Sequence, residues 1–233
     1  MIKQQLLRVP GVRPAVEQAY TQVNRRRELQ RRRAIEERDR RTLRELAGRT
    51  DLKLNVGSSG NHLDGWLSID IRADERCFGM DAAKPWPFET GSAEAINSEH
   101  FIEHLELDEA RAYLAEAFRV LRPAGLIRTT TPNLGGLVAL FTEGDPHMLE
   151  VHRSHGYAAA THGDMVNNYF YSWEHRHIYD FESLATLLRE AGFADVREAA
   201  FGESEHDLLR GIDRHDPDEL RRSVLCVDAV RPA

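Results

Sequence analysis

Hydrophobic and polar positions divide the chain into two regions of different character. Residues 14–47 carry only a thin apolar stripe between clusters of arginine and glutamate, a pattern that predicts one long, largely solvated helix. Gly48 is the expected end of this helix. From residue 51 onward, short apolar runs with the length of buried strands recur along the chain. The expected strands are Leu52–Val56, Trp66–Ile71, Ala93–Asn97, Leu126–Thr131, Val196–Phe201 and Val224–Val230.

Two amphipathic segments between these strands predict helices. Apolar residues recur at helical spacing over about Asp108–Leu121, where Asp108 can cap the start and Arg122–Gly125 turns the chain into the next strand. A second helix is expected over Phe181–Ala191, after the capping residue Asp180. Strands that alternate with helices in this way predict an α/β fold with a doubly wound, mostly parallel sheet.

The net charge of −7 conceals an uneven distribution of charge. Residues 1–50 hold 14 Lys and Arg against 6 Asp and Glu, whereas the rest of the chain holds 17 basic and 32 acidic side chains. An acidic main region disfavours nucleic acid as the principal partner. Acids three or four residues from the arginines predict ion pairs within a solvated helix, whose apolar stripe packs on the main domain or on a second copy in a homodimer. A docking arm for an anionic surface is the alternative.

Cysteine usage and hydropathy bear on the compartment. The two cysteines, Cys77 and Cys226, stand outside any CxxC pair, so neither a disulfide framework nor a thiolate zinc site is expected. No run of about 18 apolar residues occurs, and the N-terminus lacks an apolar signal-peptide core. We therefore expect no membrane span and a cytoplasmic location.

A glycine- and serine-rich turn, Asn55–Gly60, follows the first expected strand. Small residues let a ligand approach the backbone closely, and the amides of the turn can donate hydrogen bonds to it. Asp70 ends the next strand, where a carboxylate can accept hydrogen bonds from ribose hydroxyls. Asp81, in Met80–Ala82, can accept from an adenine amino group. Because the carboxyl ends of parallel strands share one edge of an open sheet, these groups predict a nucleotide-like ligand there.

Two further motifs make this pattern specific. Ala95–Leu105 reads Ala-Ile-Asn-Ser-Glu-His-Phe-Ile-Glu-His-Leu, and Arg119–Gly125 reads Arg-Val-Leu-Arg-Pro-Ala-Gly. In this order the motifs resemble those of class I S-adenosylmethionine-dependent methyltransferases, over about Leu52–Phe201. The resemblance implies a Rossmann-like sheet of seven strands, S-adenosylmethionine as the cofactor, and methyl transfer as the activity.

The chain departs from the family pattern at three places. Asn55 stands where many relatives carry an acid, and Ala124 stands where glycine is usual. Only nine residues separate Gly60 from Asp70, so the helix after the first turn is expected to be truncated or replaced by a loop. The resemblance divides the chain into an Arg-rich helical extension at residues 1–50 and a methyltransferase domain at 51–233, with an acceptor-binding insertion at about 134–178.

The resemblance also implies roles by position. The glycine turn lines the methionine moiety, the acid at the end of the second strand binds the ribose, and the turn after the fourth strand flanks the sulfonium. The implied cofactor-binding residues are Asn55, Gly57, Ser58, Gly60, Asp70, Ile71, Asp81, Ala82, Ser98, Glu99 and His100.

Methyl transfer from a sulfonium is an in-line displacement, and an oxygen nucleophile of high pKa needs a base or a metal to lose its proton. The candidate bases are His147, His177, His100 and His104. His100 and His104 share one face of a helical turn, but no third ligand stands at a diagnostic spacing, so no metal site is predicted. The mixture of Glu143, His147 and His152 is compatible with Mg²⁺ without forming a clear motif.

Six of the eleven histidines fall between residues 147 and 177, together with five aromatic residues. Aromatic faces with polar groups at their edges commonly hold polyols. With the resemblance, this predicts O-methylation of a hydroxyl on a sugar, glycan precursor or related small metabolite, so the expected partner is a small-molecule or oligosaccharide acceptor. N-methylation of a small amine is the enzymatic alternative. A noncatalytic scaffold is disfavoured by the intact glycine turn and Asp70, and an RNA methyltransferase by the acidic main region.

Overall fold

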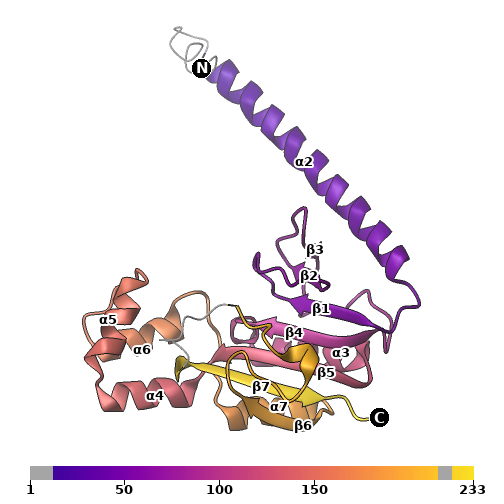
Figure 1. Cartoon of the computed structure of the whole chain (residues 1–233). Coiled ribbons are helices and arrows are strands. Elements are labelled where there is room, and N and C mark those ends of the chain that lie inside the picture. Colours follow the sequence, from indigo (N-terminus) through magenta and orange to yellow (C-terminus); the bar gives the residue numbers. More distant parts are fainter. Residues whose placement is uncertain (1–12, 215–221) are drawn as a thin grey trace. The chain divides into compact units, whose positions relative to one another are not determined.

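The computed structural model describes residues 13–214 and 222–233 of the chain. It separates into two compact units, Met1–Glu45 and Leu46–Ala233. Helix α2 (Arg13–Leu46) confirms the predicted N-terminal helix (Figure 1). Ion pairs four residues apart, such as Arg32–Glu28 at 3.0 Å, lie along it, and residues 21–34 are all exposed.

Seven strands in the described part of the second unit form one sheet, in the order β3-β2-β1-β4-β5-β7-β6 (Figure 1). Neighbouring strands are parallel except for the two pairs that β7 makes, which confirms the predicted, mostly parallel sheet. The strand order reverses at β1, so a ligand crevice is expected beyond the carboxyl ends of β1 and β4. The strands are β1 (Leu52–Val56), β2 (Leu67–Asp70), β3 (Phe78–Gly79), β4 (Ala93–Glu99), β5 (Leu121–Pro132), β6 (Ala194–Ala199) and β7 (Val224–Val230).

Helices α3 (Leu107–Val120) and α7 (Phe181–Glu190) contact each other and the strands from β5 to β7. The predicted cap of α7 is confirmed, because the Asp180 carboxylate accepts from the Ser183 amide at 2.8 Å. The predicted cap of α3 is wrong. Glu106, rather than Asp108, occupies the cap position, where its own amide donates to the Glu109 carboxylate at 3.0 Å.

A loop takes the place of the helix that would follow β1, as the short spacing predicted. The stretch between β1 and β2 is described throughout and contains no helix. Leu63 from this loop packs with Leu209 and Ile212, which belong to the connection between β6 and β7. The short helix η2 (Asp207–Leu209) lies in that connection. The connection between β6 and β7 therefore covers apolar surface of the loop after β1.

Arg128 in β5 holds this connection on the sheet. Its side chain is fully buried and donates to the Asp213 carboxylate at 2.7 and 2.9 Å and to Asp228 at 2.9 Å. It also donates to the backbone carbonyls of Ala200 and Glu203. Each of these charges would cost several kcal/mol to bury without a partner. The connection therefore has to bring Asp213 to Arg128, and this requirement fixes its position on the sheet.

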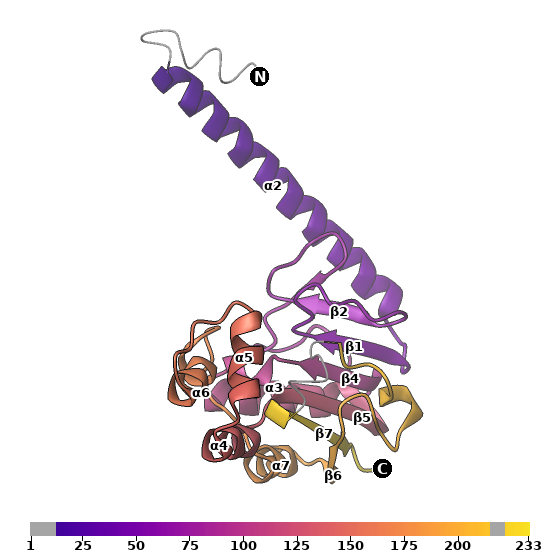
Figure 2. The same ribbon diagram turned by 60° about the vertical axis from the view of Figure 1, so that its left-hand side comes forward.

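Three helices follow β5 and gather beyond its carboxyl end (Figures 1 and 2). They are α4 (Leu134–Glu143), α5 (Pro146–Ser154) and α6 (His162–Tyr171). Their buried residues form a small core of their own. The members of this core are Leu140, Met148, Leu149, Ala159 and Met165. The insertion is thus a packed helical layer placed where β5 ends.

Two local features differ from the predictions. The segment Arg122–Gly125, expected to be a turn, lies within β5, where Ala124 has a φ of 59°. The pairing of β4 with β5 shifts register between Ala93 and Ala95, which accommodates the irregular segment. The strand β3 was not predicted, because two residues are too few to form a hydrophobic pattern. Its pairing with β2 defines it.

Candidate active site

The ends of four strands meet at the reversal point of the sheet. Val56 pairs with Ile69 of β2 on one side and with Ser98 of β4 on the other, while Asp70 pairs with Gly79 of β3. The residues that directly follow these pairs therefore share one edge. The cofactor-binding candidates lie at the ends of these strands or in the residues that follow them, so they lie along this edge of the sheet.

Gly57 begins the turn after β1 in a conformation that favours glycine. Its φ is 68°, and a Cβ atom at this position would lie 2.5 Å from Cδ2 of Phe101. The Phe101 ring, in turn, packs edge-on against Tyr113 of α3 with centroids 5.2 Å apart. The turn therefore lies against an aromatic ring from the neighbouring strand end, an approach that a side chain at position 57 would block.

Asp70 connects the second strand end to the same turn. Its carboxylate accepts from the amide of Ser59 at 3.0 Å and from the amide of Arg72 at 2.8 Å. Ile71, the next residue, is 71% exposed. Together they present an oriented carboxylate and an adjoining apolar surface at the edge of the crevice.

Asp81 and Ala82 follow β3. The Asp81 carboxylate accepts from the amide of Ala83 at 3.1 Å and pairs with Lys84 at 3.5 Å. Ala82 is buried, and its carbonyl accepts from the indole of Trp86 at 3.0 Å. The indole bond fixes this short segment at the end of the third strand.

Three of the candidates serve the protein itself. Asn55 accepts from the Asn97 amide at 2.9 Å and donates to the Asn61 carbonyl at 2.8 Å, so it ties β1 to β4 and to the turn. The Glu99 carboxylate accepts from the backbone amide of Arg214 at 2.7 Å. Ser98 is fully buried. Asn55 in place of the family's acid is explained by this pair of asparagines, since a carboxylate could not donate to the Asn61 carbonyl.

His100 stands at the end of β4 with a φ of 49° and is held by a carboxylate that the sequence reasoning did not single out. Its Nδ1 lies 3.1 Å from Oε1 of Glu103, and the other carboxylate oxygen accepts from the Thr131 hydroxyl at 3.0 Å. Burial alone would raise the pKa of the Glu103 carboxyl, but the hydrogen bond and charge of His100 outweigh it and hold that pKa below its ordinary value. The pair thus joins a buried carboxylate to an imidazole at the crevice.

His104 lies in the short helix η1 (Ile102–His104), beside a histidine from the insertion. Its ring centroid is 4.9 Å from that of His175, and both side chains are half-buried. Burial lowers the pKa of His175, although its bond to the Tyr169 carbonyl, at 2.6 Å, opposes this effect. In the sequence, only the position of Glu103 three residues after His100 could have indicated that these two side chains pair. No sequence pattern distinguished His175 from the other histidines of the insertion.

The other two candidate bases lie in different surroundings. His147 is exposed in the first turn of α5, where its backbone amide donates to Asp145. His177 packs against Tyr179, with ring centroids 4.5 Å apart, and lines a cavity of about 440 Å³ together with residues of α3 and α7 such as Arg111. The backbone amide of His177 donates to the Glu103 carbonyl at 3.2 Å, so His177 lies next to the turn after β4, with its ring packed on Tyr179.

The acidic and imidazole mixture considered for Mg²⁺ does not assemble. The Glu143 carboxylate is paired with Arg222 at 2.7 Å. His152 is buried between the rings of Tyr157 and Tyr169, and burial lowers its pKa. The sequence placed these groups close together, but the helices α4 and α5 turn them to different partners.

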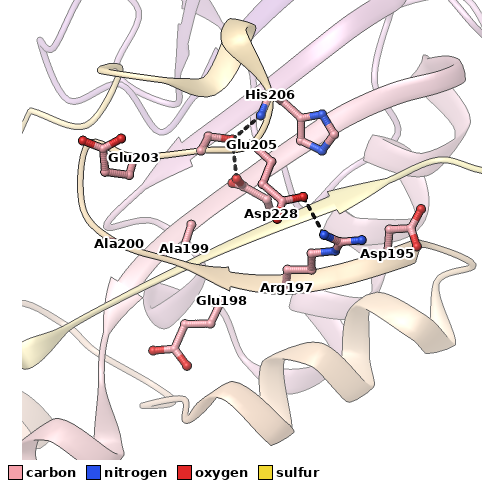
Figure 3. A pocket seen from close by; sticks show the side chains of 10 residues that line it. Asp195, Arg197, Glu198, Ala199, Ala200, Glu203, Glu205, His206 and Asp228 are labelled. Carbon is pink, nitrogen blue, oxygen red and sulfur yellow. Dashed lines mark hydrogen bonds and ion pairs between the residues drawn. The ribbon is translucent and has the colours of Figure 1, made fainter.

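A second, smaller cavity of about 230 Å³ lies at the β6 edge of the sheet (Figure 3). Arg197 is paired with Glu205 across it, and the Ser204 hydroxyl donates to Asp228 at 2.6 Å. None of its lining residues belongs to the strand-end group, so this cavity is separate from the candidate active site.

Comparison with known families decides which proteins share this arrangement. A family described as a methyltransferase domain matches residues 68–129, the segment that runs from β2 through β4 and α3 into β5. The chain therefore carries the sequence of a methyltransferase domain over residues 68–129. S-adenosylmethionine is the cofactor that the resemblance of its motifs implies for such a domain. No curated protein matches its sequence.

Several solved structures are similar to this chain at low identity. A possible exported protein from Bordetella parapertussis is 14% identical, with a TM-score of 0.49, over 84% of this chain and 66% of that protein. A SAM-dependent methyltransferase from Archaeoglobus fulgidus is 14% identical, with a TM-score of 0.48, over 85% and 94%. Phosphoethanolamine N-methyltransferase 2 from Haemonchus contortus is 13% identical, with a TM-score of 0.45, over 84% and 53%. The chain thus spans less than two thirds of the first and third of these proteins.

The residues at the strand ends fit S-adenosylmethionine. Asp70 offers an oriented carboxylate of the kind that accepts from ribose hydroxyls, and the exposed side chain of Ile71 offers apolar surface to an adenine ring. Gly57 lets the Phe101 ring pack directly on the turn after β1, which fixes the turn beside Asp70. None of the helices in the described part of the chain has the length and apolarity needed to cross a bilayer.

Proposed function

We propose that this methyltransferase O-methylates a hydroxyl group of a sugar, glycan precursor or related small metabolite, with His100 as the general base. The observation that carries the proposal is the His100–Glu103 pair at the end of β4, with Nδ1 and Oε1 3.1 Å apart. A base of this kind is what an alcohol acceptor requires, because its hydroxyl is too weak an acid to lose its proton unaided.

The chemistry supplied by S-adenosylmethionine, when bound, is an electrophilic methyl group on a sulfonium, open to in-line displacement. Asp70, Gly57 and Asp81 would hold the nucleoside and methionine parts. The Glu103 carboxylate accepts a hydrogen bond from the Nδ1–H of His100, so Nε2 is the nitrogen that takes the proton of the acceptor hydroxyl. A buried carboxylate behind the imidazole also stabilises the imidazolium that results.

The insertion at about 134–178 would bind the acceptor. Its aromatic residues Tyr157 and Trp173 pack edge-to-face, with centroids 4.7 Å apart, and remain 37% and 38% exposed. Tyr171 is 83% exposed. Rigid aromatic faces that keep contact with solvent offer apolar surface to a sugar ring while nearby polar edges offer hydrogen bonds. The division of the chain into a helical extension at residues 1–50 and a methyltransferase domain at 51–233 is part of the same proposal.

The test is transfer of a labelled methyl group from S-adenosylmethionine to a panel of free sugars, nucleotide sugars, phenols and small amines. We expect label on an oxygen of a polyhydroxylated acceptor. Label on nitrogen would overturn the choice of acceptor in favour of an amine.

On the acceptor so found, His100→Gln should lower kcat by about 10²- to 10⁴-fold, the usual contribution of a general base, with little change in cofactor affinity. His206, which lines the separate cavity at the β6 edge, supplies the control variant His206→Gln, which should keep full turnover. If His147→Gln or His177→Gln loses turnover while His100→Gln retains it, the base is misassigned.

A further inference from the structure

We propose that Glu103, His104 and His175 form a binding site for one divalent first-row transition-metal ion, Zn²⁺ above all. The inference goes beyond the proposed methylation and does not depend on the acceptor. Two of the three residues follow β4, and the third comes from the insertion, so the ion would join the insertion to the strand ends.

The distances permit a common ion. One donor atom of each residue lies within 4.8 Å of the other two. Donors held tetrahedrally by one Zn²⁺ at about 2.0–2.2 Å lie about 3.3–3.6 Å apart, so the three side chains need to draw together by up to about 1.5 Å. Adjustment of side-chain torsions in two half-buried histidines is sufficient for a shift of this size.

Two of the three ligands, His175 and Glu103, are already oriented by outer hydrogen bonds. Nδ1 of His175 lies 2.6 Å from the carbonyl of Tyr169, and because a carbonyl only accepts, Nδ1 carries the proton and Nε2 the lone pair. The Glu103 carboxylate is fixed by Thr131 and His100. Metal-ligating histidines and carboxylates characteristically have such partners, which set the tautomer and the direction of the lone pair.

The donor set indicates the kind of metal. Two imidazoles and one carboxylate make up a His₂Glu set, which leaves one position of a tetrahedral Zn²⁺ open for water or another ligand. Mg²⁺ prefers oxygen ligands and retains its waters, so it fits this set poorly. Glu103 is fully buried, and a cation beside it would offset the cost of burying its charge.

Backbone strain surrounds the three ligands. Among the non-glycine residues of the described chain with positive φ are His100 at 49°, Trp173 at 56° and Glu174 at 63°. His100 precedes Glu103 in the turn after β4, and the other two directly precede His175. Non-glycine residues seldom adopt this conformation, and such strain gathers where the surrounding structure fixes a functional geometry.

The test uses the full chain, free of any affinity tag and stripped of metal with a chelator. Zn²⁺ is titrated against a chromophoric competitor, and bound metal is counted by elemental analysis. We expect one Zn²⁺ per chain, and binding at least about 10-fold weaker in His104→Ala and in His175→Ala. His155→Ala removes an exposed histidine of the insertion and should bind as the wild type does. Zinc-edge X-ray absorption of the wild type gives a readout that needs no variant, with imidazole and oxygen ligands expected.

The proposal is overturned if the wild type binds no Zn²⁺, if both ligand variants bind it as tightly as the wild type does, or if the absorption spectrum lacks imidazole ligands. Because zinc binding is measured without acceptor, these results are independent of the labelling experiment. Failure of the zinc site leaves the proposed O-methylation standing, and a wrong acceptor leaves the zinc result unaffected.

Discussion

Replacement of Gly57 by alanine is expected to destabilise the domain by more than its backbone conformation explains. Gly57 has a φ of 68°, and a Cβ there would lie 2.5 Å from Cδ2 and 2.7 Å from Cγ of Phe101. Gly144, at the end of α4, has a nearly equal φ of 64° with no atom within 4 Å of its own added Cβ. The two glycines therefore share a conformation and differ in what a side chain would meet.

The magnitudes separate accordingly. A non-glycine residue in the left-handed region costs about 1–2 kcal/mol, and this cost applies to both positions. Overpacking against the Phe101 ring adds about 1–3 kcal/mol at position 57 only. That ring cannot swing aside freely because it packs edge-on against the buried Tyr113. We expect a loss of about 2–5 kcal/mol for Gly57→Ala and about 1–2 kcal/mol for Gly144→Ala.

Equilibrium unfolding in urea measures both losses, provided that the dependence of the free energy on urea is the same for each variant. A second comparison places Gly57→Ala in a Phe101→Ala background, where Cγ and Cδ2 are removed and only the contact with Cβ remains, so the cost should be smaller. Equal losses at the two glycines, or an unchanged cost in the Phe101→Ala background, would refute the close approach of the Phe101 ring as the reason for glycine at position 57.

Three other variants test the cofactor site, the buried ion network and a buried imidazole. Asp70→Asn should weaken S-adenosylmethionine binding roughly 10- to 100-fold in calorimetry, because a hydrogen bond to a charged group contributes about 1.5–3 kcal/mol. Asp64→Asn, at an exposed position, is the control. Equal affinity of the two variants for S-adenosylmethionine would contradict the proposed role of Asp70. Arg128→Met should cost about 3–5 kcal/mol by leaving two carboxylates buried without their partner, and lower Tm by roughly 6–20 °C in a domain of this size; an unchanged Tm would show that the network is not needed. Burial lowers the pKa of His152, so the unfolded chain binds its proton more readily, and stability falls as pH drops below about 6.5. His152→Gln should reduce this acid-side loss of Tm, and identical pH profiles for variant and wild type would disprove it.

Local sequence patterns were sufficient for six of the seven strands, for three of the helices, and for the edge of the sheet where the cofactor-binding candidates lie. The bounds of β1 and β7 agree with the predicted Leu52–Val56 and Val224–Val230, because a short apolar run between polar residues leaves few alternatives to a buried strand. The nine-residue spacing between Gly60 and Asp70 excluded a full helix there. The positions of Gly57 and Asp70 at neighbouring strand ends followed from strand order alone.

Only the tertiary structure decided which of the histidines lie together and what they contact. His147 and His100 are equally visible in the sequence, yet one is exposed on a helix of the insertion and the other is hydrogen-bonded to a buried carboxylate. His175 reaches Glu103 only because the insertion folds back from the end of β5. The sequence likewise does not show that the β6–β7 connection covers the loop after β1, held there by Arg128. The physical reason is the same in each case. Periodicity reports which face of an element is buried, whereas contacts between distant segments depend on the path of the chain between them.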